Sequence, residues 1–265
     1  MSLASAFQAL SLLAALGRPA VFLDYDGTLT PIVEQPAEAM LDRGVRRTIR
    51  RLARVADVAI VSGRQLDDLV PRVGIEGIAY AGSHGLEVQH VDGHRTVHGG
   101  ASAFVDDVRS AARSLDRRLH STNGVFIEQK RFSVAVHYRL APRVRVQYIR
   151  DVVFEVAVAC SRLQVLPGKE MLELRPCTAW DKGAAVAFLA SELATPPAMP
   201  VFIGDDFTDE NAFCVVGPRG VGIAIGEART TAARFGLADT ADVHRWIDAL
   251  VMQLADRTTD VVSSD

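Results

Sequence analysis

The chain has 265 residues and a net charge of −3, and 49% of its residues are hydrophobic while 23% are charged. This length and apolar content allow one large domain or two smaller ones with a sizeable core. A sequence pI of about 6.2, with no basic tract interleaved with aromatic residues, argues against nucleic acid as a partner.

The chain opens with an apolar stretch at residues 10–16. We interpret it as a first helix and not as a signal segment, because no basic residue precedes it and a strand follows almost at once. No apolar run in the sequence approaches the ~20 residues of a membrane span, so no membrane partner is expected. The cysteines Cys160, Cys177 and Cys214 are odd in number and lack metal-site spacing, which favours reduced thiols and a cytoplasmic protein.

A short buried strand is predicted at residues 20–23, and two carboxylates, Asp24 and Asp26, follow it directly before Gly27. Open α/β sheets hold their ligands beyond the carboxyl ends of their strands. Side chains two positions apart lie on one side of an extended strand, and the glycine lets the chain turn away. We therefore expect both carboxylates to face one pocket. The alternative is a turn or N-cap role for each.

Two later segments repeat this pattern of an apolar strand that ends in polar residues. Residues 56–61 lead into Ser62, Gly63 and Arg64, and residues 200–204 lead into an acidic run at residues 205–210. These residues supply hydroxyl and N–H groups for phosphate oxygens, and a second set of carboxylates. Capping of the helix that starts at Gln65 is the alternative role for Ser62.

Alternating strands and helices predict an α/β fold, with a parallel sheet flanked by helices, for residues 1–98 and 177–265. The expected helices there are residues 43–54, 182–193 and 243–255.

Residues 99–176 instead predict an α+β insertion that acts as a cap. Its expected elements are a helix at 104–119, two strands within 125–140, a helix at 143–159 and a hairpin at 163–175 that turns at Pro167 and Gly168. A hairpin turn at Asp92 and Gly93 precedes this insertion, and a hinge is expected near Gly99 and Gly100.

Charge separates the two predicted domains. Residues 99–176 hold 13 basic and 8 acidic residues, a net of +5, whereas the rest of the chain has a net of −8. A basic cap with an acidic, metal-binding core would attract an anionic substrate.

These residues together suit phosphoryl transfer through a covalent intermediate. A phosphate monoester is a dianion, so a carboxylate can attack its phosphorus only where positive charge offsets the repulsion, which Mg²⁺ does with hard oxygen ligands. Asp24 is the predicted nucleophile, Asp26 the general acid and base, and Lys182 the group that balances the phosphate charge, next to Ser62 and Gly63. The predicted metal ligands are Asp24, Asp26 through a nearby backbone carbonyl, Asp205 and Asp209.

Four segments in this order resemble the motifs of haloacid-dehalogenase-type phosphatases: Asp-Tyr-Asp-Gly-Thr-Leu-Thr at 24–30, Ser-Gly-Arg at 62–64, Asp-Lys-Gly at 181–183 and Gly-Asp-Asp-Phe-Thr-Asp-Glu at 204–210. More narrowly, Gly-Ser-His-Gly at 82–85, Ile-Glu-Gln-Lys at 127–130, His-Tyr-Arg at 137–139, Gly-Lys at 168–169 and Leu-Glu-Leu-Arg-Pro at 172–176 resemble trehalose-6-phosphate phosphatases. Gln129 departs from the Asp or Asn that is frequent in that family.

The resemblance implies release of trehalose and phosphate from trehalose 6-phosphate with Mg²⁺, and a functional link to a trehalose-phosphate synthase. It implies substrate contacts by Arg64, His84, Glu128, Lys130, Arg139, Lys169 and Glu173. Only three of the 29 basic residues are lysines, Lys130, Lys169 and Lys182, and all three lie in these motifs. The alternatives are a phosphatase for another sugar phosphate, and a catalytically silent sugar-phosphate-binding regulator, which the Asp24 and Asp26 pair disfavours.

Overall fold

The computed structural model describes residues 3–15, 18–33, 38–193, 199–226 and 230–262. The chain divides into two compact units: residues 1–96 with 180–265, here called the core unit, and residues 97–179, the insert unit. The boundaries expected from the sequence lie after residues 98 and 176.

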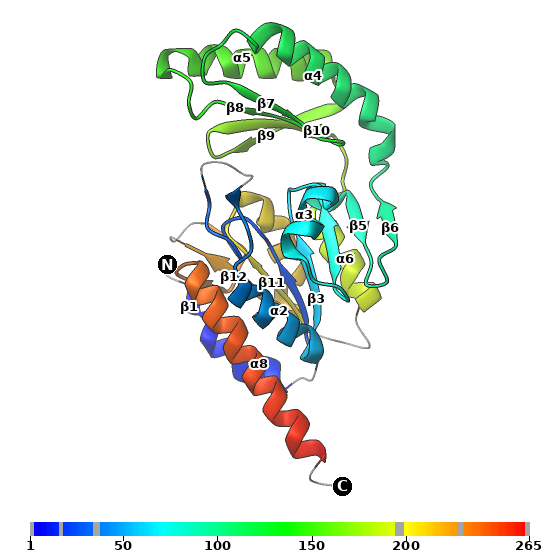
Figure 1. Ribbon diagram of the computed structural model, residues 1–265, viewed down its shortest axis with the longest axis vertical. Coiled ribbons are helices and arrows are strands. Elements are labelled where there is room, and N and C mark those ends of the chain that lie inside the picture. The colour runs from blue at the N-terminus through cyan, green and yellow to red at the C-terminus, as the bar shows by residue number, and fades with distance from the viewer. Residues whose placement is uncertain (1–2, 16–17, 34–37, 194–198, 227–229, 263–265) are drawn as a thin grey trace. The chain divides into compact units, whose positions relative to one another are not determined.

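The core unit contains a nine-stranded sheet in its described residues (Figure 1). Along the sheet, each strand from β1 through β13, β12, β11, β2 and β3 to β4 pairs in parallel with the next. Strand β5 then pairs antiparallel with β4. In spatial order the strands are β1 (Ala4–Ser5), β13 (Phe235–Leu237), β12 (Val221–Ile225), β11 (Pro200–Gly204), β2 (Ala20–Leu23), β3 (Asp57–Val61), β4 (Ala79–Gly82), β5 (Glu87–Gln89) and β6 (Arg95–Val97). The central strands are buried on both faces, which explains their continuous apolar sequences.

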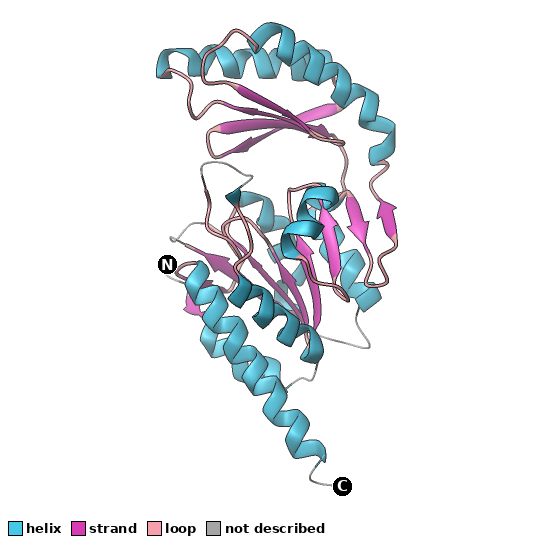
Figure 2. Ribbon diagram, viewed as in Figure 1, coloured by secondary structure: helices cyan, strands magenta, loops and turns pink. Residues whose placement is uncertain are grey.

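Helices cover both faces of this sheet (Figure 2). Val21 and Leu23 of β2 pack into one core cluster with α1 (Leu10–Ala15), α2 (Arg43–Val55), α3 (Leu66–Val73) and α8 (Thr240–Val262). Ala20 and Phe22 pack into the other with α6 (Lys182–Leu193) and α7 (Glu210–Val216). Short 3₁₀ turns occur at Ala6–Ala9, Ser83–Gly85, Ala101–Phe104, Phe207–Asp209 and Gly217–Arg219.

The expected α/β architecture is confirmed. The helix predicted at 182–193 has those bounds, and the one predicted at 43–54 extends by one residue to Val55. The first helix ends at Ala15 among the described residues, and Leu16 lies outside them. The helix predicted at 243–255 begins earlier, at Thr240, and ends later, at Val262. The predicted range therefore covers only the middle of this helix.

The insert unit is an antiparallel sheet with two helices on one face. Its strand order is β7 (Phe126–Gln129), β8 (Val134–His137), β10 (Met171–Pro176) and β9 (Leu163–Gly168). Helices α4 (Val105–Leu119) and α5 (Arg143–Ala159) bury Val134, Val136, Leu172 and Leu174 beneath them. Since strand side chains alternate, the paired residues Glu128, Ala135 and Glu173 lie on the opposite face, here called the open face.

The hairpin turn predicted at Pro167 and Gly168 is wrong by two residues. Pro167 lies within β9 opposite Leu172, and Gly168 pairs with Met171, so Lys169 and Glu170 form the turn. Glu170, the second residue of this turn, adopts a positive φ of 57°, a conformation that is uncommon for residues other than glycine.

None of the described helices combines the length and apolar character needed to span a membrane. The thiols of Cys160, Cys177 and Cys214 form no disulfide.

Candidate active site

The candidate site lies at the carboxyl ends of three neighbouring parallel strands, β11, β2 and β3. Asp24 directly follows β2, Asp205 follows β11, and Ser62 follows β3. The chain continues from β2 to β3 on one side, and β11 lies on the other side, so the site occupies a point where the strand order reverses. Ligands in open α/β sheets bind at such points.

Three carboxylates converge there. One oxygen of each of Asp24, Asp205 and Asp209 lies within 4.8 Å of the others, and Asp24 and Asp209 are buried. Two glycines make room for them. A Cβ on Gly27, whose φ is +86°, would lie 2.1 Å from an Asp205 oxygen, and a Cβ on Gly204 would lie 2.4 Å from an Asp209 oxygen. A clustered set of carboxylate oxygens fits a hard divalent cation.

Lys182, the first residue of α6, joins two of these carboxylates. Its ammonium donates to Asp24 Oδ1 and to Asp209 Oδ1, each at 2.7 Å, and its side chain is only 4% exposed. Burial alone would lower the pKa of Lys182, but the carboxylates of Asp209 and Asp24 outweigh this and raise it above that of an ordinary lysine. The ammonium therefore stays charged inside the core unit.

The balance of charge at Asp24 is different. Burial raises the pKa of Asp24 well above that of an ordinary aspartate, and although Lys182 opposes this, Asp209 and Asp205 add to it. Three carboxylates around one ammonium leave an excess of negative charge. Further positive charge is what would favour the ionised form of Asp24.

The remaining acids after β11 stabilise the local fold. Asp206 Oδ1 accepts from Phe207 N at 2.7 Å, and Asp209 Oδ2 accepts from Asp206 N at 2.9 Å, which together form a capping box. Glu210 accepts from Thr231 Oγ1 and Ala232 N. Of these three acids, Asp209 is the one that joins the carboxylate cluster.

The loop after β3 is shaped by Ser62. Its Oγ accepts from Arg64 N at 3.1 Å, which closes a tight turn around Gly63. The N-cap of α3 is Gln65, and the first N–H of that helix, from Leu66, donates to Glu87 at 3.4 Å. Ser62 instead accepts from Arg64 N, before the helix begins, so it does not have the helix-capping role that was its alternative. In its hydrogen bond to Arg64 N the hydroxyl acts as acceptor, and a hydroxyl also has a proton to donate.

His84 packs against this loop. A Cβ on Gly63 would lie 2.8 Å from Cε1 of His84, and His84 N donates to Ser62 O at 3.0 Å. Ser83 and His84 both have positive φ, at 51° and 57°, a conformation that is strained for residues other than glycine. The hydrogen bond from Ser83 Oγ to Glu87 at 2.8 Å helps to hold it.

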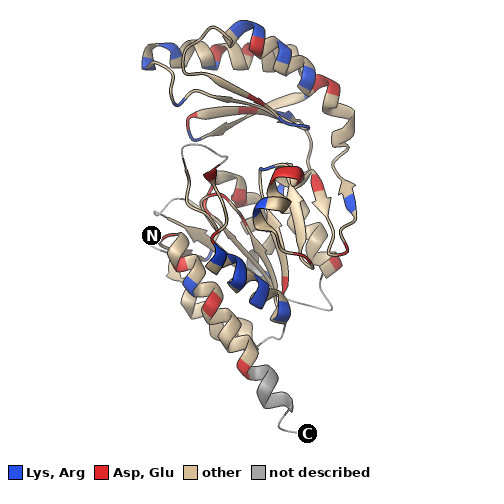
Figure 3. Ribbon diagram, viewed as in Figure 1, with Lys and Arg blue, Asp and Glu red and all other residues tan. Residues whose placement is uncertain are grey.

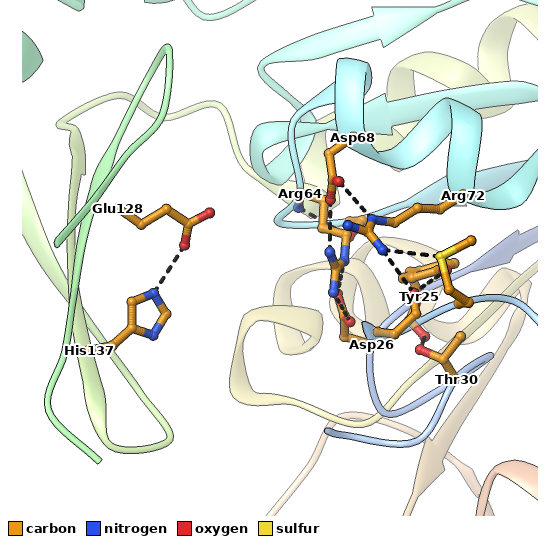
Figure 4. A network of polar contacts seen from close by, with 11 residues as sticks. Tyr25, Asp26, Thr30, Arg64, Asp68, Arg72, Glu128 and His137 are labelled. Atoms are coloured by element: carbon orange, nitrogen blue, oxygen red, sulfur yellow. Dashed lines mark hydrogen bonds and ion pairs between the residues drawn. The ribbon is translucent and has the colours of Figure 1, made fainter. Parts of the chain in front are cut away.

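Asp26 is paired with Arg64 through two hydrogen bonds (Figure 4). Arg64 Nε donates to Asp26 Oδ2 at 2.7 Å, and Arg64 Nη2 donates to Asp26 Oδ1 at 2.6 Å. Burial would lower the pKa of Arg64, but the hydrogen bonds to Asp26 and Asp68 outweigh it and raise the pKa. The side chain of Asp26 is 40% exposed, in contrast to that of Asp24, so the two acids have different surroundings although they are two residues apart.

The open face of the insert unit gathers the predicted sugar-binding residues of β7 and β10. Lys130 Nζ donates to Glu173 Oε1 at 3.0 Å, and Ser133 Oγ donates to the same oxygen at 2.6 Å. Glu128 pairs with His137 Nε2 at 3.0 Å (Figure 4), and this hydrogen bond lowers the pKa of Glu128.

Arg139 and Lys169 lie elsewhere in the insert unit, near the turn between β9 and β10. Arg139 pairs with Glu170 at 3.2 Å, and Lys169 precedes this glutamate in the turn. The structure thus brings Glu128, Lys130 and Glu173 together on one sheet face and places Arg139 and Lys169 beside the hairpin.

The family can be assigned from comparison with known proteins. A sequence model of the family described as Trehalose-phosphatase matches residues 22–241. The chain belongs to this family. A trehalose-phosphate phosphatase of Mycobacterium bovis is 42% identical over 95% of this chain. The chain spans 66% of the length of that relative, just under two thirds.

Solved structures support this membership of the trehalose-phosphatase family and its fold. A structure titled trehalose-6-phosphate phosphatase related protein has a TM-score of 0.79 and 26% identity, and covers 90% of this chain and 99% of its own. A haloacid dehalogenase-like hydrolase from Bacteroides thetaiotaomicron shares the fold, with a TM-score of 0.62 and 16% identity. The match covers 90% of this chain and 99% of that hydrolase. The expected haloacid-dehalogenase fold class is therefore confirmed.

Proposed function

We propose that this protein hydrolyses trehalose 6-phosphate to trehalose and phosphate through an aspartyl-phosphate on Asp24. The observation that carries the proposal is the position of Asp24 in a chain of the trehalose-phosphatase family. Asp24 directly follows the central strand β2, accepts a hydrogen bond from Lys182, and has an oxygen within 4.8 Å of two further carboxylates. A buried carboxylate in such a cluster is suited to attack a phosphorus atom that is itself held by positive charge.

The reaction has two steps. An oxygen of Asp24 attacks phosphorus while the bond from phosphorus to the sugar oxygen breaks, and Asp26 gives its proton to that oxygen. In the second step water attacks the phosphorus of the aspartyl-phosphate, Asp26 takes a proton from this water, and the Asp24 carboxylate is restored. Ser62 and the N–H of Gly63 hold phosphate oxygens, and Lys182 balances their charge.

The family and the carboxylate cluster imply a divalent cation, which we propose is Mg²⁺. When bound, it would neutralise charge between the Asp24 carboxylate and the phosphate dianion. Asp24 and Asp205 would hold it, with a backbone carbonyl near Asp26. Asp209 is the weaker donor, because its oxygens already accept hydrogen bonds from Lys182 and from Asp206 N. Its main role would be to fix the Lys182 ammonium.

We propose that the insert unit acts as a cap that recognises the sugar. A disaccharide presents many hydroxyls, and its recognition needs paired acceptors and donors. Glu128, Lys130 and Glu173 provide both on one face of the sheet, as their hydrogen bonds show. Arg139 and Lys169 near the hairpin, and Arg64 and His84 in the core unit, are further proposed contacts.

The proposal also includes an enzyme that supplies the substrate and a cellular location for this protein. A trehalose-phosphate synthase would make the phosphate ester that this protein consumes. A cytoplasmic location is proposed because the chain has three cysteines and forms no disulfide among them.

The proposed function is tested by phosphate release from a panel of sugar phosphates, each assayed with Mg²⁺, with other divalent cations and with EDTA. We expect trehalose 6-phosphate to have the highest kcat/KM and EDTA to abolish release. Preference for another sugar phosphate would overturn the substrate, full activity in EDTA would overturn the cation, and binding without release would indicate a regulatory module.

A further inference from the structure

A second acid lies behind the pair of Asp26 and Arg64. Arg64 Nη1 donates to Asp68 Oδ2 at 2.7 Å, so one guanidinium joins both carboxylates (Figure 4). Arg72 Nε donates to the other oxygen of Asp68, also at 2.7 Å. The four side chains form one row, from Asp26 through Arg64 and Asp68 to Arg72.

The far end of this row is anchored in the core unit. Asp68 and Arg72 are four residues apart on α3, so they lie on one side of the helix. The helix itself is fixed by the arginine-rich α2 (Figure 3), because Arg46 donates to the carbonyls of Val73 and Arg72, and Arg50 donates to that of Gly74. Asp68 is therefore a carboxylate on a firmly held element.

At the near end of the row, the backbone before Asp26 is fixed by the buried Tyr25, whose carbonyl accepts from Leu29 N and Thr30 N. The carboxylate of Asp26 is held by its two hydrogen bonds from Arg64. Asp26 is 40% exposed and lies in the loop after β2. The guanidinium of Arg64 is also held by the face of Tyr25, with its centre 5.4 Å from the ring centroid, but that contact leaves rotation in the ring plane unrestrained. The hydrogen bond that a third nitrogen, Nη1, donates to Asp68 fixes this rotation, since guanidinium donors form a rigid planar fork.

We propose that Asp68 is a positioning residue for proton transfer to the sugar oxygen: it fixes Arg64, and Arg64 fixes the carboxyl group of Asp26. This inference rests on the proposed function. Both oxygens of Asp26 accept hydrogen bonds from Arg64. When Asp26 is protonated, one of its oxygens keeps its hydrogen bond from Arg64, and the protonated oxygen turns to the sugar oxygen that leaves. Asp68 holds the guanidinium still while this exchange occurs.

A purely structural role for Asp68 is the competing explanation, because acids in the first turn of a helix favour it through the helix dipole. Asp67 provides a matched control. It lies in the same turn of α3, carries the same charge, and its side chain is 90% exposed and paired with Arg95. Asp67→Asn removes the helix-dipole contribution without touching the row.

The test compares two small phosphate monoesters that do not fill a disaccharide pocket. Glycerol phosphate has an alkoxide leaving group that needs a proton, and nitrophenyl phosphate has a stable phenolate that needs none. For Asp68→Asn we expect kcat/KM to fall about ten-fold for glycerol phosphate, or about 1.4 kcal/mol of barrier, and less than two-fold for nitrophenyl phosphate. Asp68→Glu should recover part of the loss, and Asp67→Asn should leave both values unchanged.

If kcat/KM of Asp68→Asn falls equally for the two esters, or does not fall, the proposal for Asp68 is overturned. The proposed function would still stand, because it depends on the activity of the wild-type protein. Should Asp68→Asn not fold, Arg72→Gln loosens the row from its far end. In that variant we expect a smaller loss of kcat/KM, again larger for glycerol phosphate than for nitrophenyl phosphate. Equal losses for the two esters, or no loss, in Arg72→Gln would also overturn the proposal. A wild-type protein that releases no phosphate from either ester or from trehalose 6-phosphate would overturn the proposed function itself.

Discussion

The charged groups of the core unit and of the insert unit are held in different ways. In the core unit Asp24, Asp209 and Lys182 are nearly inaccessible to solvent and share hydrogen bonds of 2.7 Å. On the open face of the insert unit Lys130 and Glu173 are also mostly buried, but Glu128 and His137 keep about a third and a quarter of their side-chain area exposed. Buried charges must be paired at all times, whereas exposed ones can exchange partners cheaply. The buried cluster of Asp24, Asp209 and Lys182 therefore suits a fixed site, whereas the exposed pair of Glu128 and His137 can exchange its hydrogen bonds for those of a ligand.

The largest effect is expected at the nucleophile. Asp24→Asn keeps the size of the side chain, so the fold should persist, but an amide cannot form the covalent intermediate. We expect turnover of every phosphate ester to fall by at least about 10⁴-fold. Steady-state assays with circular dichroism as a control for folding would measure this, and appreciable residual activity would contradict an aspartyl-phosphate route.

The next effect is expected at the buried ammonium. Lys182→Met removes the partner of Asp24 and Asp209 and leaves two carboxylates buried, which should lower the free energy of unfolding by about 3 kcal/mol. Urea denaturation in EDTA would measure it. Addition of a divalent cation should recover part of this stability. The relevant control is Lys169→Met in the exposed hairpin of the insert unit, which should have little effect on stability.

A smaller and more selective effect is expected on the open face. Glu128→Ala removes a charged acceptor, so KM for trehalose 6-phosphate should rise about ten-fold or more. KM for nitrophenyl phosphate should stay within about two-fold, because that ester has no sugar. Equal changes for the two substrates would mean that the insert unit does not confer specificity.

The smallest effect is a change in titration. The hydrogen bond from His137 is the main cause of the lowered pKa of Glu128. A lowered carboxyl pKa stabilises the folded chain above the pKa of the unfolded chain, and this stabilisation is lost as pH falls through the folded-state value. His137→Ala should therefore move the NMR titration midpoint of the Glu128 carboxyl to higher pH. His120→Ala, on the exposed end of α4, should not change it.

Local sequence patterns predicted most of the elements in both units. The apolar runs before Asp24, Ser62 and Asp205 are buried strands, as expected because strands covered on both faces are mostly apolar. The order that brings them together, β11 next to β2 and β2 next to β3, depends on pairing between distant segments, which periodicity does not encode. The sequence patterns therefore predicted a parallel sheet but not its strand order, and the resemblance to a known family implied only that Asp24, Ser62 and Asp205 belong to one site.

The interactions within the candidate site were less predictable. Asp26 and Arg64 are separated by 38 positions in the chain, and no local pattern relates them. The same applies to the pairing of Ser133 with Glu173, 40 positions apart. Asp68 and Arg72 did carry a signal, their spacing of four on a predicted helix, but such pairs are common on helix surfaces, and the spacing alone does not show that Arg64 joins the row.

The two units also differ in how much of the chain must exist before each can form. The insert unit is one continuous stretch, so all its strands have been synthesised once β10 emerges from the ribosome. The sheet of the core unit pairs β2 with β11 and β1 with β13, and these partners are made only after the insert unit is complete. During translation, at about 5–20 residues per second, the apolar strand β2 therefore waits for its neighbour β11, and nascent core segments are exposed to aggregation or chaperone binding for longer than those of the insert unit.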